Sequence, residues 1–160
     1  MQDAVRAVQV DGRGEVLGLA GRRLSPSEWV EITQANVDAF ARSVQDWHWA
    51  HNDPDRAARG PFERPIAHVH LTLSLVPHLR ESLLTFASGE CMFYGYDRVR
   101  FPTAVPVGAH VRMSATVVQV DEIAGGEQLT LDLRIESEGE GRPGCVARAI
   151  WRHYDVVAPA

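Results

Sequence analysis

The chain has 160 residues, enough to bury most of its unfolded surface around one core, so we expect a single domain over residues 1–160. Hydrophobic residues make up 45% and charged residues 23%, a balance typical of soluble globular proteins, and no apolar run is long enough to span a bilayer. The formal net charge of −5, with both signs interspersed, argues against nucleic acid as a partner, because phosphate binding depends on clustered Lys and Arg.

The N-terminal segment, residues 1–22, is polar and contains several glycines, with weak strand tendency around residues 8–10 and 16–19. We therefore expect a loosely ordered lead-in there. The segment lacks the basic, apolar and small-residue order of a signal peptide, which predicts a cytoplasmic protein. In that reducing compartment Cys91 and Cys145, which have no metal-ligand spacing, need not pair and are expected to be small core residues.

Two helix starts follow the lead-in. Residues 25–29 read Ser-Pro-Ser-Glu-Trp, whose first and fourth residues can form a capping box, and predict a short helix. Thr33 caps a clearer helix that should end at residue 44 or 45. Residues 47–64 are irregular and rich in turn formers, except that Pro54 can start a helical turn capped by Asp53. The apolar face of the clearer helix consists of Val37, Phe40, Ala41 and Val44.

Pro65 opens the most continuous apolar run of the chain, which extends to Leu84. Positions 68–76 alternate well enough to pass for a strand. The length of the run and the proline at its start favour a buried helix instead, which Pro77 should kink.

The second half of the chain is strand and turn. Gly125-Gly126 and residues 139–144 mark turns between segments that alternate apolar and polar residues. One long buried helix and four long strands predict an α+β domain, in which a curved antiparallel sheet wraps around a long central helix. The four predicted strands are residues 93–101, 107–120, 128–136 and 145–155.

Residues 46–75 hold the densest collection of acid/base groups, including four of the seven histidines, next to an apolar run. Such a combination is what a substrate pocket needs. Asp46 and His51 stand five positions apart across a segment that cannot be regular helix throughout, so a turn can bring their side chains together. A carboxylate and an imidazole can hold and polarise a water molecule and return a proton as general acid. We therefore predict that Asp46 and His51 form an acid/base pair.

The helix expected after Pro65 supplies backbone N–H groups that can stabilise negative charge. The amides of its first turn, including those of Ala67, His68 and Val69, have no partner within the helix and carry partial positive charge. Such amides can stabilise the oxyanion that develops on a thioester carbonyl when its α-proton is removed.

Two further pairs of polar side chains are candidates for binding. Arg98 and Arg100 alternate on a predicted strand and share one face, where they either meet an anionic substrate tail or are solvated. His68 and His70, with His48 nearby, have the spacing of metal ligands on a strand, but the carboxylate that a cupin-like site needs three or four residues later is absent. No metal is therefore predicted. On a helix these two histidines would point in different directions, so at least one is expected to be a core residue.

The central stretch resembles a known family. The sequence is similar to the MaoC-like (R)-specific enoyl-CoA hydratases and dehydratases of the hot-dog superfamily, whose signature runs Asp, a few residues, His, Asp-Pro and then a Pro-Ile-Ala-His-Gly helix start. The resemblance covers about residues 33–154. The residues that carry it are, in chain order, Asp46, His51, Asp53-Pro54, Ala57, Gly60-Pro61-Phe62 and Pro65-Ile66-Ala67-His68.

The resemblance implies a single hot-dog domain, a homodimer, and a hydro-lyase that adds water to an enoyl thioester or eliminates it from a 3-hydroxyacyl thioester. Asp46 and His51 would be the catalytic pair, and the backbone amide of Val69 the oxyanion donor. The partner is then an acyl-CoA or an acyl-carrier-bound substrate, and no cofactor is implied. Around the substrate we expect His48, Phe62, Ile66, His68, His70, Arg98 and Arg100.

The chain departs from the family pattern at several positions. Val69 stands where the signature has Gly, and its β-branched side chain crowds the place that the thioester oxygen must approach. Glu63 replaces another Gly, and His48 stands where Asn or Gln is common. These departures predict a pocket reshaped for an unusual acyl chain, such as a polyketide-like intermediate of secondary metabolism.

Two other functions of hot-dog proteins are alternatives to the hydro-lyase. A thioesterase needs a carboxylate on or facing the long helix, and none lies between Pro65 and Arg80. A repurposed hot-dog protein, which binds a ligand or catalyses a rearrangement or isomerisation without net hydration, stays open as the alternative because of Val69.

Overall fold

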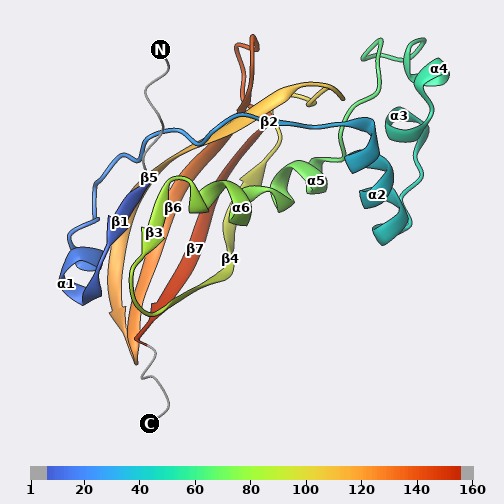
Figure 1. The fold of residues 1–160 in the computed structure, drawn as a ribbon. Helices are drawn as coiled ribbons and strands as arrows, with labels where there is room; N and C mark the ends of the chain where they lie inside the picture. Colours follow the sequence, from blue (N-terminus) through green and yellow to red (C-terminus); the bar gives the residue numbers. More distant parts are fainter. Residues whose placement is uncertain (1–6, 156–160) are drawn as a thin grey trace.

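Five strands form one curved antiparallel sheet in the order β2-β5-β6-β7-β4 in the computed structural model, which describes residues 7–155 (Figure 1). The four long strands predicted from the alternation of apolar and polar residues are confirmed. β5 and β6 meet in a tight turn at Gly125, whose φ of 79° lies in the left-handed region that glycine adopts without strain. The sheet consists of β2 (Val30–Glu31), β4 (Glu90–Arg100), β5 (His110–Ile123), β6 (Gly126–Ser137) and β7 (Cys145–Tyr154).

Two consecutive helices, α5 (Val69–Ser74) and α6 (Val76–Glu81), cross the concave face of the sheet (Figure 1). Every second residue of β7 is buried, so one face of the strand forms the core and the other faces outward. Val76 and Leu79 of α6 are buried in the same hydrophobic core. The predicted α+β architecture, a curved antiparallel sheet wrapped around a central helical segment, is therefore confirmed, but the segment consists of two six-residue helices rather than one long helix.

Residues 65–84 form helix rather than strand over most of their length, but the helix begins later than predicted. The amide of Ile66 donates to the carbonyl of Ala50 at 2.9 Å, and the amide of Ala67 donates to the carbonyl of Val105 at 2.8 Å. These two residues therefore extend toward neighbouring segments, and the prediction that Ala67 has a free amide is wrong. The expected interruption at Pro77 is confirmed, because this residue lacks the N–H that would continue the helical ladder and α5 gives way to α6 at Leu75.

Residues 7–22 are more ordered than predicted. β1 (Val8–Val10) pairs in parallel with β3 (Leu84–Phe86), and α1 (Gly12–Leu17) follows it. Val16 and Leu19 are fully buried. The expectation of a loosely ordered lead-in is therefore wrong for this range, because the elements are too short to show a period although they pack into the core. Residues 1–6 lie outside the described part of the chain.

Residues 25–29 are extended, and the short helix predicted there is wrong. The amide of Ser27 donates to the carbonyl of Met113 at 2.8 Å, and its hydroxyl accepts from the amide of Met113 at 2.9 Å. Hydrogen bonds to β5 thus replace the local capping box that the sequence offers.

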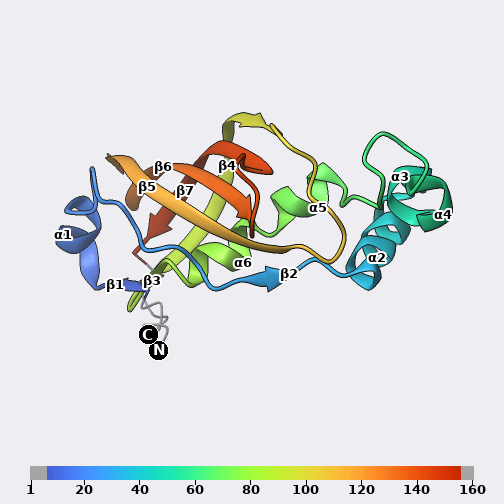
Figure 2. The same ribbon diagram turned by 90° about the horizontal axis from the view of Figure 1, so that it is seen from above.

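Three helices gather at one end of the sheet: α2 (Gln34–Val44), α3 (Trp49–Asn52) and α4 (Pro54–Ala57) (Figure 2). Thr33 caps α2 by accepting from the amide of Asn36, and Asp53 caps α4, both as predicted. Val37 and Ala41 are buried as expected, whereas Val44 is exposed because α2 packs only through its first two turns. None of the helices within residues 7–155 has the length and apolarity needed to cross a bilayer.

Candidate active site

Asp46, His51 and His68 meet where α2 ends, α3 begins and α5 is about to start. One ligand-capable atom of each side chain lies within 4.8 Å of the corresponding atom of the other two. Three separate elements thus deliver a carboxylate and two imidazoles to one place. The structure brings the predicted pair together and adds His68 to it.

His51 has a defined tautomer. Its Nδ1 lies 2.7 Å from the carbonyl oxygen of Ile66. Since a carbonyl only accepts, Nδ1 carries the proton, and Nε2 of the neutral ring holds a free lone pair. The ring stacks on that of His68, with centroids 3.8 Å apart. His51 therefore presents a proton acceptor in a fixed orientation.

Burial lowers the pKa of His51 below its ordinary value, and the positive charges that His68 and His48 would carry act in the same direction. The hydrogen bond to Ile66 and the charge of Asp46 oppose this shift without cancelling it. The ring is therefore neutral at pH 7, which is the form that accepts a proton.

Asp46 follows a reversal of the chain. Gln45, with a φ of 60°, ends α2 in the left-handed conformation, and the Asp46 amide donates back to the carbonyl of Ala41 at 3.1 Å. The Asp46 carbonyl accepts from Nε2 of His68 at 3.0 Å, and a carboxylate oxygen lies 3.9 Å from the same nitrogen. The carboxylate itself is half exposed. It can therefore reach both solvent and the His51 ring.

His68 is a core residue, as expected for at least one of the two histidines of the helix. Its side chain is only 3% exposed. Because Nε2 donates to a carbonyl, Nδ1 is an acceptor, and no hydrogen-bond partner for it is found among the described residues. His68 positions Asp46 and packs against His51.

The cluster is poorly arranged for a metal ion. His51 Nδ1 and His68 Nε2 already bond to backbone carbonyls, so only His51 Nε2 and His68 Nδ1 could coordinate. The two rings are stacked within 28° of parallel, and lone pairs in the planes of stacked rings do not converge on one point about 2.1 Å away. The geometry therefore favours proton transfer over metal binding.

Val69 is the first residue of α5. Its amide has no backbone or side-chain acceptor in the described structure, as expected for the first turn of a helix. Its side chain is 38% exposed, so the isopropyl group stands at the surface where a ligand would approach the amide.

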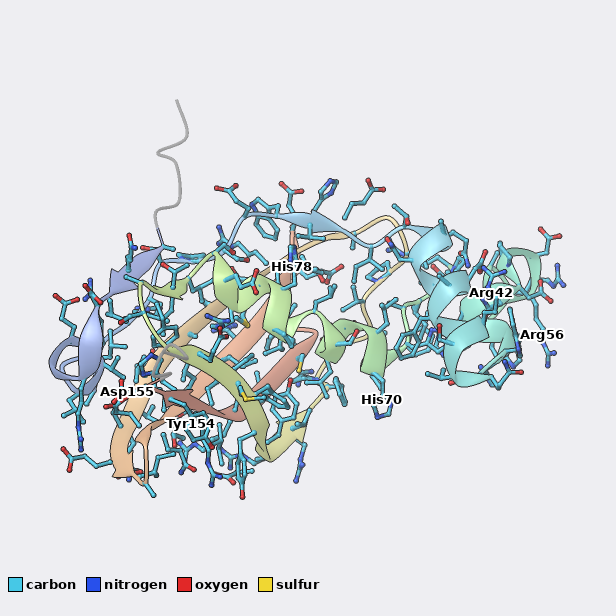
Figure 3. The ribbon with its side chains drawn as sticks, turned by 60° about the horizontal axis from the view of Figure 1, so that its bottom comes forward. Arg42, Arg56, His70, His78, Tyr154 and Asp155 are labelled. Atoms are coloured by element: carbon cyan, nitrogen blue, oxygen red, sulfur yellow. The ribbon has the colours of Figure 1, made fainter. Side chains whose placement is uncertain are left out.

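The other predicted binding residues divide into two groups. Phe62 and Ile66 line a hollow of about 350 Å³ together with Arg64 and Pro106. Because the Ile66 carbonyl also binds His51, this hollow adjoins the cluster. His48 instead caps α3, its Nδ1 accepting from the amide of Ala50 at 3.3 Å, and His70 projects outward from α5 toward Phe101 (Figure 3).

Arg98 and Arg100 share one face of β4, as predicted, but it is the outer face of the sheet. They pair with Arg148 and Val146, whose neighbours on β7 are the residues that point into the core. Alternation fixes which residues share a face without saying which face is covered. These arginines are therefore solvated and lie outside the Asp46 cluster of this chain.

The site also uses groups that the sequence reasoning missed. The carbonyl of Ile66 orients His51, and no side-chain pattern marks a backbone acceptor. Gln34, Asp38 and Asn52 surround the main chain of His51; their signal was the four-residue spacing of Gln34 and Asp38 on one helix face. The two cysteines are free thiols, and burial raises the pKa of each to about 11, so both are unreactive; Cys145 is a core residue as predicted, whereas Cys91 is only partly buried against the core.

Known proteins share both the fold and the sequence pattern. The solved structure of an (R)-hydratase from A. caviae involved in PHA biosynthesis is 29% identical with a TM-score of 0.70, and the match covers 82% of this chain and 94% of that one. A monoamine oxidase regulatory protein from Archaeoglobus fulgius, at 23% identity and a TM-score of 0.75 over 96% of this chain and 100% of its own, shows the fold alone.

Relatives among characterised sequences are more similar. A 3-hydroxyacyl-thioester dehydratase Z of Mycobacterium tuberculosis (strain ATCC 25618 / H37Rv) is 40% identical over 141 residues, which cover 87% of this chain and 93% of the relative. Nodulation protein N of Rhizobium leguminosarum bv. viciae is 36% identical over 135 residues, 81% of this chain and 83% of that protein. The family model described as MaoC like domain matches residues 16–138. The chain therefore belongs to the MaoC-like dehydratase family of hot-dog proteins.

Proposed function

We propose that the protein is a hydro-lyase that adds water to a 2-enoyl thioester and, in reverse, dehydrates a 3-hydroxyacyl thioester. The observation that carries this proposal is the neutral His51 ring, one nitrogen of which lies within 4.8 Å of an Asp46 carboxylate oxygen. The related (R)-hydratase and thioester dehydratase support the substrate class.

The reaction follows from the geometry of the pair. A water molecule can bond to both side chains, because ligand-capable atoms less than 4.8 Å apart lie within reach of one bridging oxygen. As the water oxygen bonds to C3 of the enoyl group, its proton passes to the pair, and the π electrons of the double bond move toward C2. A proton from the pair then bonds to C2, so that water is added and both catalytic groups are restored.

Negative charge develops on the thioester oxygen during this step. The free amide of Val69 at the start of α5 is the proposed donor to that oxygen. The hollow lined by Phe62 and Ile66 is the proposed site for the acyl or pantetheine chain.

The test is incubation of the purified protein with crotonyl-CoA and with a longer 2-enoyl-CoA, while the absorbance of the conjugated thioester is followed. Hydration removes the conjugation, so the absorbance should fall. If the absorbance falls neither with these two substrates nor with carrier-bound enoyl thioesters, the proposal is contradicted. That result would favour a protein that binds or rearranges its ligand without net hydration.

Val69 should limit the rate with simple substrates. Replacing Val69 by Gly removes the side chain beside the proposed oxyanion donor, and kcat/KM for crotonyl-CoA should rise by up to about tenfold, the factor that corresponds to ~1.4 kcal/mol of relieved crowding. Val69→Ala, which keeps a small side chain, should give an intermediate rate. An unchanged or lower rate in both variants would mean that Val69 does not shape the pocket, and would remove the support for a polyketide-like acyl substrate of secondary metabolism.

We also propose that the protein is a homodimer joined along β4. This strand is an edge of the sheet, and it exposes three consecutive large apolar residues, Met92, Phe93 and Tyr94. An unpaired edge of this length attracts a second strand. Light scattering should give twice the mass of the chain, and Met92→Lys with Tyr94→Lys should halve it. Val118→Lys, at an exposed apolar residue of the inner strand β5, is the control that should stay dimeric; a monomeric wild type would refute the proposal.

A further inference from the structure

Three polar side chains next to the cluster form a clamp that no catalytic step uses. Asp38 Oδ1 accepts from Nε2 of Gln34 at 2.8 Å and from Nδ2 of Asn52 at 2.8 Å. The same Gln34 nitrogen also donates to the backbone carbonyl of His51 at 2.9 Å. The clamp therefore joins α2 to two consecutive residues of α3, one of which is His51.

We propose that Asp38 is a positioning residue that, through Gln34 and Asn52, holds His51 at the reacting water; this inference rests on the proposed hydro-lyase function. Within the described residues, the Asp38 carboxylate bonds to Gln34 and Asn52 and makes no hydrogen bond to the His51 ring. It acts through the main chain of α3.

The length of α3 explains why a clamp is needed. The helix has only four residues, Trp49–Asn52, and a helix this short is not stable by itself. Its own support consists of three backbone bonds, from the amides of His51 and Asn52 to the carbonyl of His48 at 3.0 and 3.3 Å and from the amide of Asp53 to the carbonyl of Trp49 at 3.1 Å, together with the cap from His48. External hydrogen bonds must fix the remainder, and the clamp supplies two of them.

The clamp also sets the distance between the two catalytic groups. Gln34 and Asp38 lie one turn apart on α2, the helix whose C-terminus presents Asp46. Because the clamp ties His51 to that same helix, the positions of both Asp46 and His51 are fixed relative to α2. A displacement of about 1 Å at a catalytic group can cost two orders of magnitude in rate.

The Asp38 carboxylate stays ionised, so the hydrogen bonds of the clamp persist at neutral pH. Hydrogen bonds from Gln34 and Asn52, together with the charge of Arg42, lower the pKa of Asp38, so its carboxylate stays an acceptor at neutral pH. The other side-chain atom of Asn52, Oδ1, is buried without a partner in the described residues. Asp38 is therefore the group that fixes the orientation of this amide.

The test compares Asp38→Leu with Asp38→Asn, using crotonyl-CoA. Asn keeps an Oδ1 that can accept both hydrogen bonds, so Asp38→Asn should retain kcat within about threefold, whereas Asp38→Leu should lose about 10- to 100-fold in kcat with little change in KM. Gln34→Met, which breaks both the Asp38 and the His51 contacts at a partly exposed site, should reproduce the loss if Asp38→Leu does not fold. Asp121→Leu is the matched control, because the Asp121 carboxylate also accepts from a glutamine side chain, the Nε2 of Gln119 on β5.

If Asp38 acts by positioning His51, the loss of kcat caused by Asp38→Leu should disappear once the His51 ring is removed. In a His51→Ala background, Asp38→Leu should cause no further loss of kcat. A wild-type rate in folded Asp38→Leu, or the same loss with and without the His51 ring, would overturn the inference.

A readout without turnover separates this inference from the proposed function. Histidine NMR should show the His51 imidazole pKa rising toward about 6.5 in Asp38→Leu, because a released ring is better solvated, and staying in place in Asp38→Asn. If the wild type is inactive with every thioester, the proposed function fails, and the NMR titration alone decides the clamp: an unshifted His51 pKa in Asp38→Leu then refutes it.

Discussion

Replacing His51 by Ala should lower kcat for thioester hydration by about 10²- to 10⁴-fold, the usual contribution of a positioned general acid or base. Asp46→Asn should cause a loss of similar size, because an amide cannot exchange protons with the bridging water. Both substitutions leave the fold intact, since the Asp46 side chain is half exposed and His51 contributes one side-chain hydrogen bond. The measurement is the initial rate of absorbance loss with crotonyl-CoA.

His78 provides the matched control for His51. It is an exposed histidine of α6 and is not a member of the Asp46 cluster (Figure 3). His78→Ala should leave kcat unchanged. Retention of full activity in either Asp46→Asn or His51→Ala would show that the pair is not the acid/base and would favour the non-hydrating alternative.

A second large effect is expected on stability, at the opposite end of the sheet from the site. His153 and Glu127 are buried, with 1% and 0% of their side chains exposed. His153 Nδ1 lies 2.9 Å from a Glu127 carboxylate oxygen, and Nε2 lies 2.9 Å from the carbonyl of Ser88. Both ring nitrogens therefore lie beside oxygen atoms that can accept, an arrangement that favours the doubly protonated ring, a cation paired with the Glu127 carboxylate. The second carboxylate oxygen of Glu127 lies 3.5 Å from Arg13.

His153→Leu should destabilise the protein by about 3–5 kcal/mol, the cost of removing one partner of a buried ion pair, because only the half-exposed Arg13 would remain near Glu127. Chemical denaturation with urea measures it. The double variant Glu127→Leu with His153→Leu should recover most of the loss, because no charge is then buried without its partner. A single variant as stable as the wild type would contradict the assignment of a buried pair.

The same pair makes stability depend on pH. Burial alone would lower the pKa of His153, but the hydrogen bonds to Glu127 and Ser88 and the charges of Glu127 and Asp155 outweigh burial and raise it. A raised pKa in the folded state means that the stabilisation is complete below about pH 6.5, the value for an unfolded histidine, and is lost as the pH rises through the raised value. The free energy of unfolding should fall over that range in the wild type, and the fall should be absent in His153→Leu.

Gly89 shows how closely the pair is enclosed. Its φ of 77° is left-handed, and a Cβ at this position would overlap the His153 ring. The His153 ring thus has room only because the residue 64 positions earlier is a glycine, and no local sequence pattern could reveal this.

The sequence predicts the elements that have a strong period. The four long strands and α2 alternate or repeat clearly enough to be recognised, because each buries one full face against the core. β1, β3 and α1 are short, and their few buried residues become meaningful only through contacts with distant segments. Pro65 and Ile66 predict a helix start that is too early, because these residues and Ala67 bond to other segments of the chain instead.

The sequence predicts which side chains could exchange protons at the site, but not the backbone groups that orient them or the side of the sheet on which neighbouring residues lie. The order of Asp46 and His51 on an irregular segment indicates a pair, and the structure places them together. Backbone acceptors such as the Ile66 carbonyl have no sequence signal. The face of Arg98 and Arg100 depends on which side of the sheet the helix covers, which alternation alone leaves open.

The most direct test of the central claim, that Asp46 and His51 act as one acid/base unit, is kcat/KM for crotonyl-CoA in the wild type, in Asp46→Asn, in His51→Ala and in the double variant. If the two groups share one water, as proposed, removing the second after the first should change little, and the double variant should be no slower than the slower single variant. Losses that multiply in the double variant would mean that the two side chains act independently, and a wild type without activity would contradict the account as a whole.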